Sequence, residues 1–401
     1  MRIAFFADNF YPELSGISDS ILITGTELVR RGHRVCYVAP RYSARDYEVV
    51  ARALPEEPEY IKGMPVVRLP SVRLLRSPTG QSRIALPTGR SFSFLRAFKP
   101  DIIHTHSPYG TGLEALRIAK KFGVPLVGTN HTPVEEFYRF APSIARRLDA
   151  YYYNHCAYIT APYQALITSM QQKGFKCSGK AIPNPVELPL FYPVQNEDEK
   201  DALRKDMGLA EPVVIYSGRI ASEKRIDVLL HAVKLLTPHF PSLSLLITGL
   251  GVEHHNLRIL AHQLAIEKWV HFTGFVPPDE LARYYRASDA FVIMSTADSQ
   301  SLSLMQAYAT GVPAVCARSK GLPDYTPSDC GFLVEPGDHR ALAEKLKLLL
   351  NDDALRERMG KAAVTFAKTL SPEKIAKEWE EIYRNTIDRN LSLENASVQS
   401  V

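Results

Sequence analysis

The chain has 401 residues, of which 45% are hydrophobic and 23% are charged. This composition is typical of a globular protein and argues against extensive disorder. At roughly 150 residues per domain, the length favours two domains. The formal net charge of +5 is unevenly spread, since residues 1–190 carry +9 and the remainder −4. We expect the basic half to face something anionic; a chance imbalance of surface charge is the alternative.

Three further classes of protein are not expected from this sequence. The five cysteines form no Cys-x-x-Cys pair, which argues against a disulfide scaffold or a zinc finger and suits a reducing cytosol. Met1 leads directly into an alternating apolar run, so we expect no signal peptide. Residues 150–172 and 299–317 lack charged side chains, but polar residues and prolines interrupt both, so neither has the continuous apolar stretch of about 20 residues that a membrane span needs.

Runs rich in β-branched residues alternate with helical periodicity along residues 1–190. The predicted strands of this half are Arg2–Ala7, Val35–Ala39, Pro65–Leu69, Asp101–Thr105, Pro125–Thr129 and Tyr158–Thr160. The predicted helices are Ile17–Arg31, Gly112–Phe122, Ile144–Cys156 and Gln164–Lys173. Because strands joined by crossover helices run parallel, this half is predicted to hold a parallel sheet.

The alternation stops and then starts again after residue 200. Four prolines between Ile182 and Val194, followed by the acidic run Glu197–Glu199, predict an interdomain linker. The predicted strands beyond it are Pro212–Ser217, Ser244–Thr248, Val270–Thr273, Ala290–Met294 and Pro313–Ala317. The predicted helices are Lys224–Leu236, His255–Ala265, Asp279–Arg286, Leu302–Ala309 and Arg340–Asn351.

The predicted organisation is therefore α/β, with two Rossmann-like halves at 1–190 and 191–370. Ligands of open parallel sheets bind at the carboxyl ends of the strands, so each half is expected to line a central cleft. A last amphipathic helix is predicted at Lys374–Ile387, with Ser371 as its N-cap and Pro372 in its first turn. With the polar tail 390–401, which we expect to be frayed, it forms a third segment at 371–401.

Two loops of this pattern are candidates for binding phosphate. The first joins the first strand to a helix at Gly16, where a glycine and free helix N–H groups let an anion approach. The second begins with Gly218-Arg219 at the end of a strand and reaches Lys224 five residues later. Two cations at a strand end suit a diphosphate, whose charge must be neutralised; a surface pair of Arg219 with Glu223 is the alternative.

Two other glycine and acidic motifs lie in the second half. Gly249-x-Gly251 lacks the third glycine or alanine of a dinucleotide fingerprint, so it predicts a tight strand-to-helix turn and argues against an NAD-dependent enzyme. Asp298 follows a strand and precedes a helix that carries Gln306. Asp298 and the first N–H groups of that helix could hold sugar hydroxyls and phosphate; a plain N-cap at Asp298 and an exposed Gln306 are the alternative.

Histidines end two neighbouring strands of the first half. His104 and His106 end one strand, and His131 ends the next. Strand-end histidines face the expected cleft, where one could donate a hydrogen bond or transfer a proton. Because no carboxylate lies beside them and no Asp-x-Asp occurs in the chain, we do not expect a metal site.

Five arginines and no acidic residue lie between positions 68 and 90. These arginines are Arg68, Arg73, Arg76, Arg83 and Arg90. Leucines and other aliphatic residues stand between them, which suits a loop or a short helix lying on anionic lipid. A solvated loop is the alternative, and nucleic acid is not favoured because the segment has no aromatic residue for base stacking.

The order of these motifs resembles the retaining glycosyltransferases of family 4, which have the GT-B fold. The resemblance covers the chain from Arg2 to about Ile387. It is carried by the Gly16 loop, His106, Gly218-Arg219 with Glu223-Lys224, Gly249-x-Gly251, Gly274-Phe275-Val276, Asp298-x7-Gln306 and Ala309-Thr310-Gly311-Val312-Pro313. The resemblance implies transfer of a hexose from a nucleotide-diphosphate sugar, without a cofactor or a metal.

The resemblance also implies roles for single residues. Arg219 and Lys224 would hold the donor diphosphate with the backbone near Gly16, and His106 matches the histidine near the reacting centre. Asp298 and Gln306 match the two acids of the family's Glu-x7-Glu motif, which grip the donor sugar and the ribose. The other implied donor-binding residues are Gly218, Gly249, Gly274, Val276, Ser299, Gln300, Ser301 and Leu302.

The chain departs from the family at both acids, because Asp298 is shorter than glutamate and Gln306 is uncharged. A neutral amide bonds a hydroxyl more weakly than a carboxylate does. The run from Asn130 through His131 and Glu135 to Tyr138 most resembles diacylglycerol glucosyltransferases. Such enzymes imply a lipid acceptor, with His131, Glu135, Arg73 and Arg76 on the acceptor side, and a cytoplasmic protein peripheral to the inner face of an anionic membrane. A polysaccharide acceptor, a sugar-nucleotide epimerase and a non-catalytic sugar-nucleotide-binding protein are the alternatives.

Overall fold

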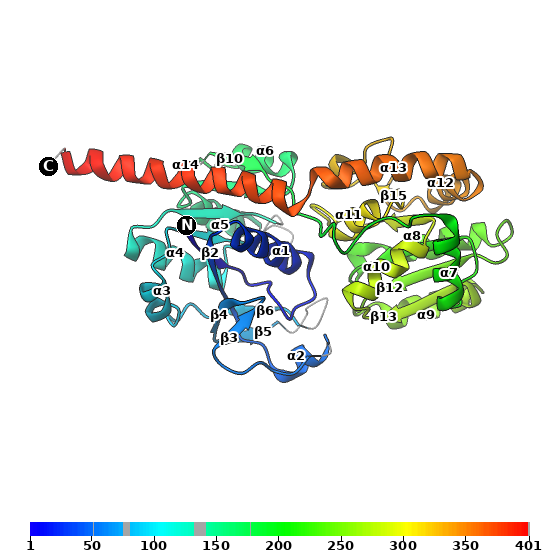
Figure 1. Ribbon diagram of the computed structural model, residues 1–401, viewed down its shortest axis with the longest axis horizontal. Helices are drawn as coiled ribbons and strands as arrows, with labels where there is room; N and C mark the ends of the chain where they lie inside the picture. The colour runs from blue at the N-terminus through cyan, green and yellow to red at the C-terminus, as the bar shows by residue number, and fades with distance from the viewer. Residues whose placement is uncertain (51, 75–80, 132–141, 177, 400–401) are drawn as a thin grey trace. The chain divides into compact units, whose positions relative to one another are not determined.

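The computed structural model describes residues 1–50, 52–74, 81–131, 142–176 and 178–399 (Figure 1). It divides the chain into two compact units. Among the described residues, unit 1 joins those up to Pro185 with those from Pro372 onward, and unit 2 is Val186–Ser371. The chain therefore leaves unit 1 once and returns to it with its last helix.

Unit 1 is built on an eight-stranded sheet in the order β10-β9-β8-β7-β1-β2-β4-β3. All neighbours pair in parallel except β3 and β4. The strands are β1 (Arg2–Phe6), β2 (Arg34–Pro40), β3 (Glu59–Ile61), β4 (Met64–Leu69), β7 (Ile102–Thr105), β8 (Leu126–Thr129), β9 (Tyr158–Ala161) and β10 (Gly179–Ala181). The helices are α1 (Gly16–Arg30), α2 (Ala44–Glu48), α3 (Phe92–Phe98), α4 (Gly110–Phe122), α5 (Pro142–Tyr153), α6 (Gln164–Gln172) and α14 (Pro372–Gln399).

Unit 2 repeats the architecture with a six-stranded, all-parallel sheet in the order β13-β12-β11-β14-β15-β16. Its strands are β11 (Val213–Ser217), β12 (Ser244–Thr248), β13 (Val270–Gly274), β14 (Ala290–Ile293), β15 (Ala314–Ala317) and β16 (Gly331–Val334). Its helices are α7 (Glu197–Met207), α8 (Ile226–Leu236), α9 (His254–Gln263), α10 (Pro278–Ala287), α11 (Leu302–Ala309), α12 (His339–Asn351) and α13 (Asp353–Thr369). The predicted α/β class with two Rossmann-like halves is confirmed.

Three predictions about local structure are wrong. The acidic run 197–199 is not part of a linker but the first turn of α7, where Asn196 caps the Glu199 N–H at 2.9 Å and the acids face the positive end of the helix dipole. The tail is helical rather than frayed as far as it is described, because α14 continues to Gln399. Lys224 does not begin a long helix, because Arg225 takes a left-handed conformation at φ 50° and α8 starts at Ile226.

The last helix, α14, drawn in red in Figure 1, lies against α1. Its apolar face joins the core of unit 1, where Trp379 and Tyr383 pack with residues of the sheet such as Ile3 and Phe5. At its middle, Glu380 accepts two hydrogen bonds from the Arg31 guanidinium at 2.8 and 2.9 Å. The same carboxylate lies 2.7 Å from His33 Nε2. In the part of the chain that the structure describes, no helix is long and apolar enough to cross a bilayer.

The contacts of Glu380 with Arg31 and His33 predict that the free energy of unfolding depends on pH. Hydrogen bonding from Arg31 lowers the pKa of Glu380 from 4.5 to about 2. A carboxyl whose pKa falls on folding stabilises the protein above its ordinary pKa, and this contribution is lost as the pH falls from about 4.5 towards 2. Glu380→Gln should therefore cost on the order of 2–3 kcal/mol at pH 7 and flatten this acid dependence, as measured by urea unfolding at pH 7 and pH 3.

Glu378→Gln is the matched control for this prediction. Glu378 lies half a turn away on α14 and pairs with Lys180 at the surface. Exposed pairs contribute about 0–1 kcal/mol, so this variant should keep the acid dependence of the parent. Equal acid dependence in the parent and in the Glu380 variant would contradict the assignment.

Candidate active-site residues

Three strand-end turns of unit 2 pack closely because they carry glycines. A Cβ atom at Gly249 would lie 2.0 Å from the Gly218 carbonyl oxygen, and one at Gly251 would lie 2.1 Å from the Ile220 carbonyl oxygen. Gly218 and Gly249 also take positive φ angles of 148° and 122°, which favour glycine. Gly249 N–H donates to the Gly274 carbonyl at 2.8 Å. The predicted tight turn at 249–251 is confirmed, and the turns after β11, β12 and β13 lie side by side.

Lys224 and Asp298 form the central ion pair of this edge. The Lys224 ammonium donates to both carboxylate oxygens of Asp298 at 2.7 Å, and the two side chains are 11% and 16% exposed. Burial alone would raise the pKa of Asp298, but the Lys224 charge and hydrogen bonds from Lys224 and Ser295 outweigh it, so the pKa lies below its usual value of 3.8. Asp298 is therefore ionised at neutral pH beside a buried cation.

Arg219 stands on the same loop with a weaker attachment. Its Nη2 atom lies 3.1 Å from Glu223 Oε1, and both side chains are about one third exposed. The pairing of Arg219 with Glu223, which the sequence offered as the alternative, is thus present. Only one of the five guanidinium N–H groups is needed for this contact, so Arg219 keeps donors for an anion.

Backbone contacts hold the Asp298 loop to the Lys224 turn. Thr296 N–H donates to the Glu223 carbonyl at 2.9 Å, and the Asp298 carbonyl accepts from Gly321 N–H at 3.2 Å. The N-cap of α11 is Ser301, whose hydroxyl accepts from Leu304 N–H at 3.2 Å, so the alternative of a plain N-cap at Asp298 is wrong. Asp298 is therefore placed to act as a charged side chain rather than to cap the helix.

The remaining donor-side candidates follow the same edge. Ser299 and Gln300 lie in the turn that precedes α11, and Leu302 begins this helix. Gln306 is one turn further on, half-buried, and its Oε1 atom accepts from the Tyr285 hydroxyl at 3.3 Å. Gly274 ends β13 at φ 73°, with Val276 just beyond. Tyr285 was not among the candidates, because no local pattern links an α10 tyrosine to a residue on α11.

In unit 1 the three candidate histidines divide into two kinds. His104 was expected to face a cleft, but it is fully buried and hydrogen-bonded at 2.7 Å to both the Tyr383 hydroxyl and the Thr129 hydroxyl. It is a structural residue that ties α14 to the sheet. The sequence missed this because Tyr383 lies 279 residues further along the chain.

His106 and His131 form a pair beside it. His106 Nδ1 lies 3.0 Å from His131 Nε2, so one nitrogen carries the hydrogen and the other accepts it. Burial holds the pKa of His106 well below 6.5 and lowers that of His131 to about 4, so both rings are neutral at pH 7. Among the described residues, no group of His, Cys, Asp and Glu could hold a metal ion.

Gly16 begins α1, and Ser15 caps that helix by accepting from Ile17 N–H at 3.3 Å. The loop before it is held by residues that the sequence did not single out. Gln81, which is 2% exposed, accepts from Leu14 N–H at 3.2 Å, and the Ser82 hydroxyl donates to Glu13 at 2.6 Å. No sequence signal connects these residues, which lie 67 and 69 positions apart.

The arginine segment differs from the expected loop or short helix. Its ends pair as an antiparallel hairpin of β5 (Ser71–Arg73) and β6 (Arg83–Ala85). Arg68 is buried on Glu59 at 2.7 Å, and Arg83 pairs with Asp46 at 3.1 Å. These two cations are therefore neutralised internally and do not serve an anionic surface. Arg73 is exposed on β5, Arg90 is exposed 3.9 Å from Glu57, and Arg76 and Glu135 lie outside the described residues.

Comparisons with known proteins agree with this architecture. Residues 14–189 match the model described as Glycosyltransferase Family 4, and residues 197–366 match Glycosyl transferases group 1. The alpha-monoglucosyldiacylglycerol synthase of Streptococcus pneumoniae is 25% identical over 406 residues, which cover 97% of this chain and 87% of the relative.

Solved structures show the same fold. Sucrose-phosphate synthase from Thermosynechococcus elongatus aligns with a TM-score of 0.81 at 20% identity, covering 97% of this chain and 100% of the other. Anabaena HepE in complex with UDP-glucose aligns with a TM-score of 0.76 at 18% identity, covering 96% and 100%. With one family model on each unit, the chain belongs to the family 4 glycosyltransferases of GT-B fold.

Proposed function

We propose that this glycosyltransferase moves glucose from uridine diphosphate glucose to a diacylglycerol-type membrane lipid, with retention at the anomeric carbon. The S. pneumoniae relative, matched over almost its whole length, carries the acceptor class and the sugar in its name. The UDP-glucose complex of Anabaena HepE supports the donor. The observation that carries the chemistry is the buried Lys224–Asp298 pair with Arg219 on the adjoining turn.

In this proposal Lys224 and Arg219 bind the donor diphosphate. An ammonium has three N–H donors, and Asp298 takes two of them at 2.7 Å, so the third is available for a phosphate oxygen without loss of the pair. Asp298 in turn accepts hydrogen bonds from sugar hydroxyls, and Gln306 from its position on α11 bonds the ribose. Ser299, Gln300, Ser301 and Leu302 add backbone N–H groups at the start of that helix.

The reaction breaks the bond between the anomeric carbon and the diphosphate oxygen, and its electron pair stays on the diphosphate. The acceptor hydroxyl oxygen bonds to the same face of the carbon, and its proton passes to a phosphate oxygen. Negative charge builds on the leaving group, so preorganised cations stabilise the transition state more than the ground state. No metal is required for this neutralisation when two cations and a helix N-terminus face the diphosphate.

On the acceptor side, we assign His106 and His131 as neutral groups near the reacting centre, and exposed cations of unit 1 such as Arg73 as contacts to lipid. The protein would act at the cytoplasmic face of an anionic membrane. A lipid acceptor requires such a peripheral attachment, and the basic charge of residues 1–190 favours it.

A donor panel tests the proposal. Nucleotide release is measured with uridine, guanosine and adenosine diphosphate sugars, with and without vesicles that contain diacylglycerol and anionic lipid. Release from UDP-glucose only with diacylglycerol, and a glucolipid product with retained configuration, is the expected result. An isomerised sugar nucleotide from donor alone would mean an epimerase, and donor binding without release across all acceptors would mean a non-catalytic protein; either result overturns the proposal.

A further inference from the structure

The Gln306 side chain of α11 is bonded to a buried tyrosine of α10, a helix that contacts α11. Tyr285 is fully buried, and its hydroxyl oxygen lies 3.3 Å from Gln306 Oε1. Gln306 is half-buried, and among the described residues its side-chain amide has no other hydrogen-bond partner. The oxygen of an amide only accepts and its nitrogen only donates, so the end that faces Tyr285 decides what the other end offers to a ligand.

Two serine hydroxyls decide the direction of this hydrogen bond. Burial raises the pKa of Tyr285, and hydrogen bonds with Ser217 and Ser303 act against this rise, as they do when the serines donate to the phenolic oxygen. That oxygen carries one hydrogen and accepts at its lone pairs. With two serines donating to it, Tyr285 has its own hydrogen left for Gln306. The amide oxygen therefore faces Tyr285.

The serine of the Tyr285 contact is in turn oriented by the first turn of α11. Ser301 Oγ accepts from Leu304 N–H at 3.2 Å and lies 2.9 Å from Ser303 Oγ. Because Ser303 gives its single hydrogen to Tyr285, the hydrogen between the two serines comes from Ser301. The hydrogens then all point the same way, from Ser301 through Ser303 and Tyr285 to Gln306. We call these four residues the Tyr285 chain; the bonds of such a chain polarise and strengthen one another.

The Tyr285 chain leaves the Nε2 hydrogens of Gln306 for a ligand. A glutamate, which the family motif has at this position, is ionised at neutral pH and only accepts hydrogen bonds. The amide of Gln306 offers two N–H donors instead, while its oxygen is bonded to Tyr285. A ribose hydroxyl both donates and accepts, so it fits either side chain, but through different atoms.

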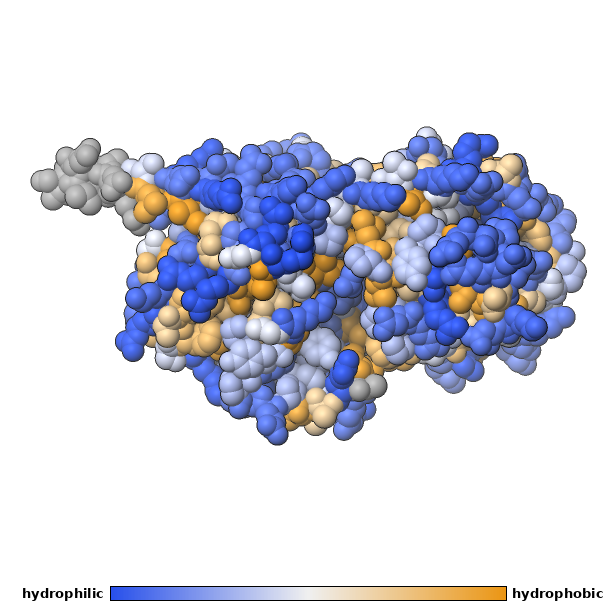
Figure 2. Space-filling model, viewed as in Figure 1, coloured by the Kyte–Doolittle hydropathy of each residue, from blue (hydrophilic) through white to orange (hydrophobic). Residues whose placement is uncertain are grey.

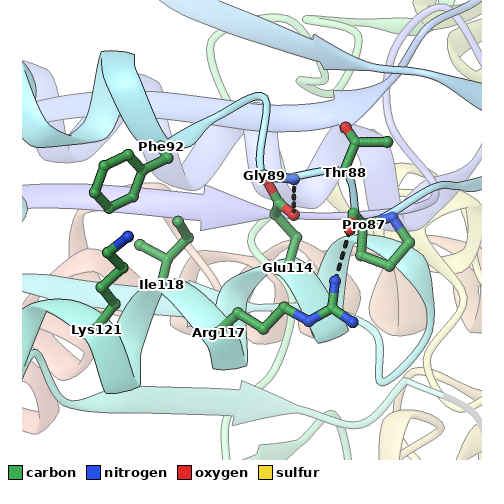
Figure 3. A pocket seen from close by; sticks show the side chains of 8 residues that line it. All are labelled: Pro87, Thr88, Gly89, Phe92, Glu114, Arg117, Ile118 and Lys121. Atoms are coloured by element: carbon green, nitrogen blue, oxygen red, sulfur yellow. Dashed lines mark hydrogen bonds between the residues drawn. The ribbon is translucent and has the colours of Figure 1, made fainter.

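Other polar features of the molecule do not single out a ligand in this way. In the cavity of about 380 Å³ beside α4 (Figure 3), Glu114 accepts from Gly89 N–H at 2.9 Å and Arg117 donates to the Pro87 carbonyl at 2.6 Å. Both side chains are therefore engaged by the backbone around them. Figure 2 shows hydrophilic residues over much of the face that it draws, so a polar surface by itself marks no site. The Tyr285 chain differs because it fixes the donor and acceptor ends of one half-buried amide.

We propose that Gln306 binds the ribose of the sugar nucleotide as a hydrogen-bond donor, from Nε2 to a ribose oxygen, and that Tyr285 is the positioning residue that fixes this direction. The inference rests on the donor site proposed above and adds to it the kind of ribose that the site accepts. A ribose in which fluorine replaces a hydroxyl keeps a weak acceptor but loses the donor. Such a ribose should still bond to Gln306, whereas a deoxyribose should not.

The test compares the binding of nucleoside diphosphates and needs neither acceptor nor turnover. Full-length protein is titrated by calorimetry with UDP and with analogues that carry hydrogen or fluorine in place of the 2′- or the 3′-hydroxyl. At the position that Gln306 contacts, the deoxy analogue should bind about 5- to 10-fold more weakly than UDP, because the amide donor loses its partner. The fluoro analogue should bind more tightly than the deoxy analogue. In Gln306→Glu this order should reverse, since the fluorine then faces a carboxylate and is repelled by it.

Tyr285→Phe tests the positioning role with an analogue that only donates. UDP with an amine in place of the same hydroxyl, titrated at a pH at which the amine is protonated, has no acceptor for the Gln306 N–H groups. In the variant the amide is free to turn Oε1 towards the ammonium. This analogue should therefore bind about 5-fold more tightly to the variant than to the parent, while UDP binds both within about twofold. A merely structural loss would weaken the binding of every analogue.

Tyr308→Phe is the matched control, because Tyr308 is also fully buried and lies on α11, but Tyr285 is the residue that bonds to Gln306. This variant should keep the Kd values of the parent for the whole series. If the parent and Gln306→Glu rank the fluoro and deoxy analogues alike at both positions, the proposal is overturned. It is also overturned if Tyr285→Phe gains no affinity for the amino analogue.

These results are distinct from a failure of the proposed function. Binding of ADP or GDP in place of UDP would contradict UDP-glucose as the donor, and the same ribose series on that nucleotide would still test Gln306. If no nucleoside diphosphate binds to the protein, both proposals are wrong.

Discussion

Lys224→Ala should lower kcat by about two to three orders of magnitude with UDP-glucose as donor. The ammonium is the buried cation of the donor side, 2.7 Å from both oxygens of Asp298. Removal of one preorganised donor from a site of developing charge typically costs 10²–10³ in kcat. Initial rates of nucleotide release, with a titration of donor concentration, separate this loss from a change in KM.

The variant also leaves Asp298 as a buried charge without its partner, which by itself destabilises a protein. A second variant, Lys224→Met/Asp298→Asn, removes both charges and should recover thermal stability without recovering kcat. Arg225→Gln is the matched control, since Arg225 is the next residue but pairs with Asp227 on α8, and its kcat should remain within about twofold. Near-normal turnover of Lys224→Ala would refute the role assigned to this pair.

Gly249→Ala should reduce both stability and activity. The added Cβ atom would meet the Gly218 carbonyl oxygen at 2.0 Å, and alanine would have to adopt φ 122°. Overpacking and backbone strain each cost about 1–3 kcal/mol, so unit 2 should lose about 3–5 kcal/mol. At 2–4 °C per kcal/mol for a domain of this size, its Tm should fall by roughly 10 °C. Because the displaced peptide carries Arg219 on its carboxyl side, kcat at low temperature should also fall.

Gly208→Ala gives the comparison that isolates the steric clash. Gly208 also takes a positive φ, 64°, but a Cβ atom there would meet nothing within 4 Å. This variant should cost only about 1 kcal/mol and leave kcat unchanged. Scanning calorimetry gives the Tm of both variants, and kcat is measured below their unfolding transitions. Equal losses would mean that the contact of the two turns is unimportant.

The sequence by itself determined the α/β repetition and most of its elements. It did not predict the strands β3, β5, β6, β10 and β16 or the helices α2, α3, α7 and α13. Predicted and observed bounds agree within a few residues for most strands, and α11 was predicted at its observed limits, Leu302–Ala309. These features follow from local periodicity, from caps and from glycines at turns, all of which are read over a few neighbouring residues. The family motifs are local in the same sense, so the donor-side candidates could be listed before the fold was known.

Only the tertiary structure decided how each charged or polar side chain is used. Lys224 forms an ion pair with Asp298, 74 residues further along the chain. His104 is buried and hydrogen-bonded to Tyr383, and Arg68 forms a buried ion pair with Glu59. Arg117 and Lys121, by contrast, are exposed on α4. The partners and the burial of a polar side chain decide whether it can bind a ligand or is used only within the fold. Those partners lie far away along the chain, and no local pattern specifies them.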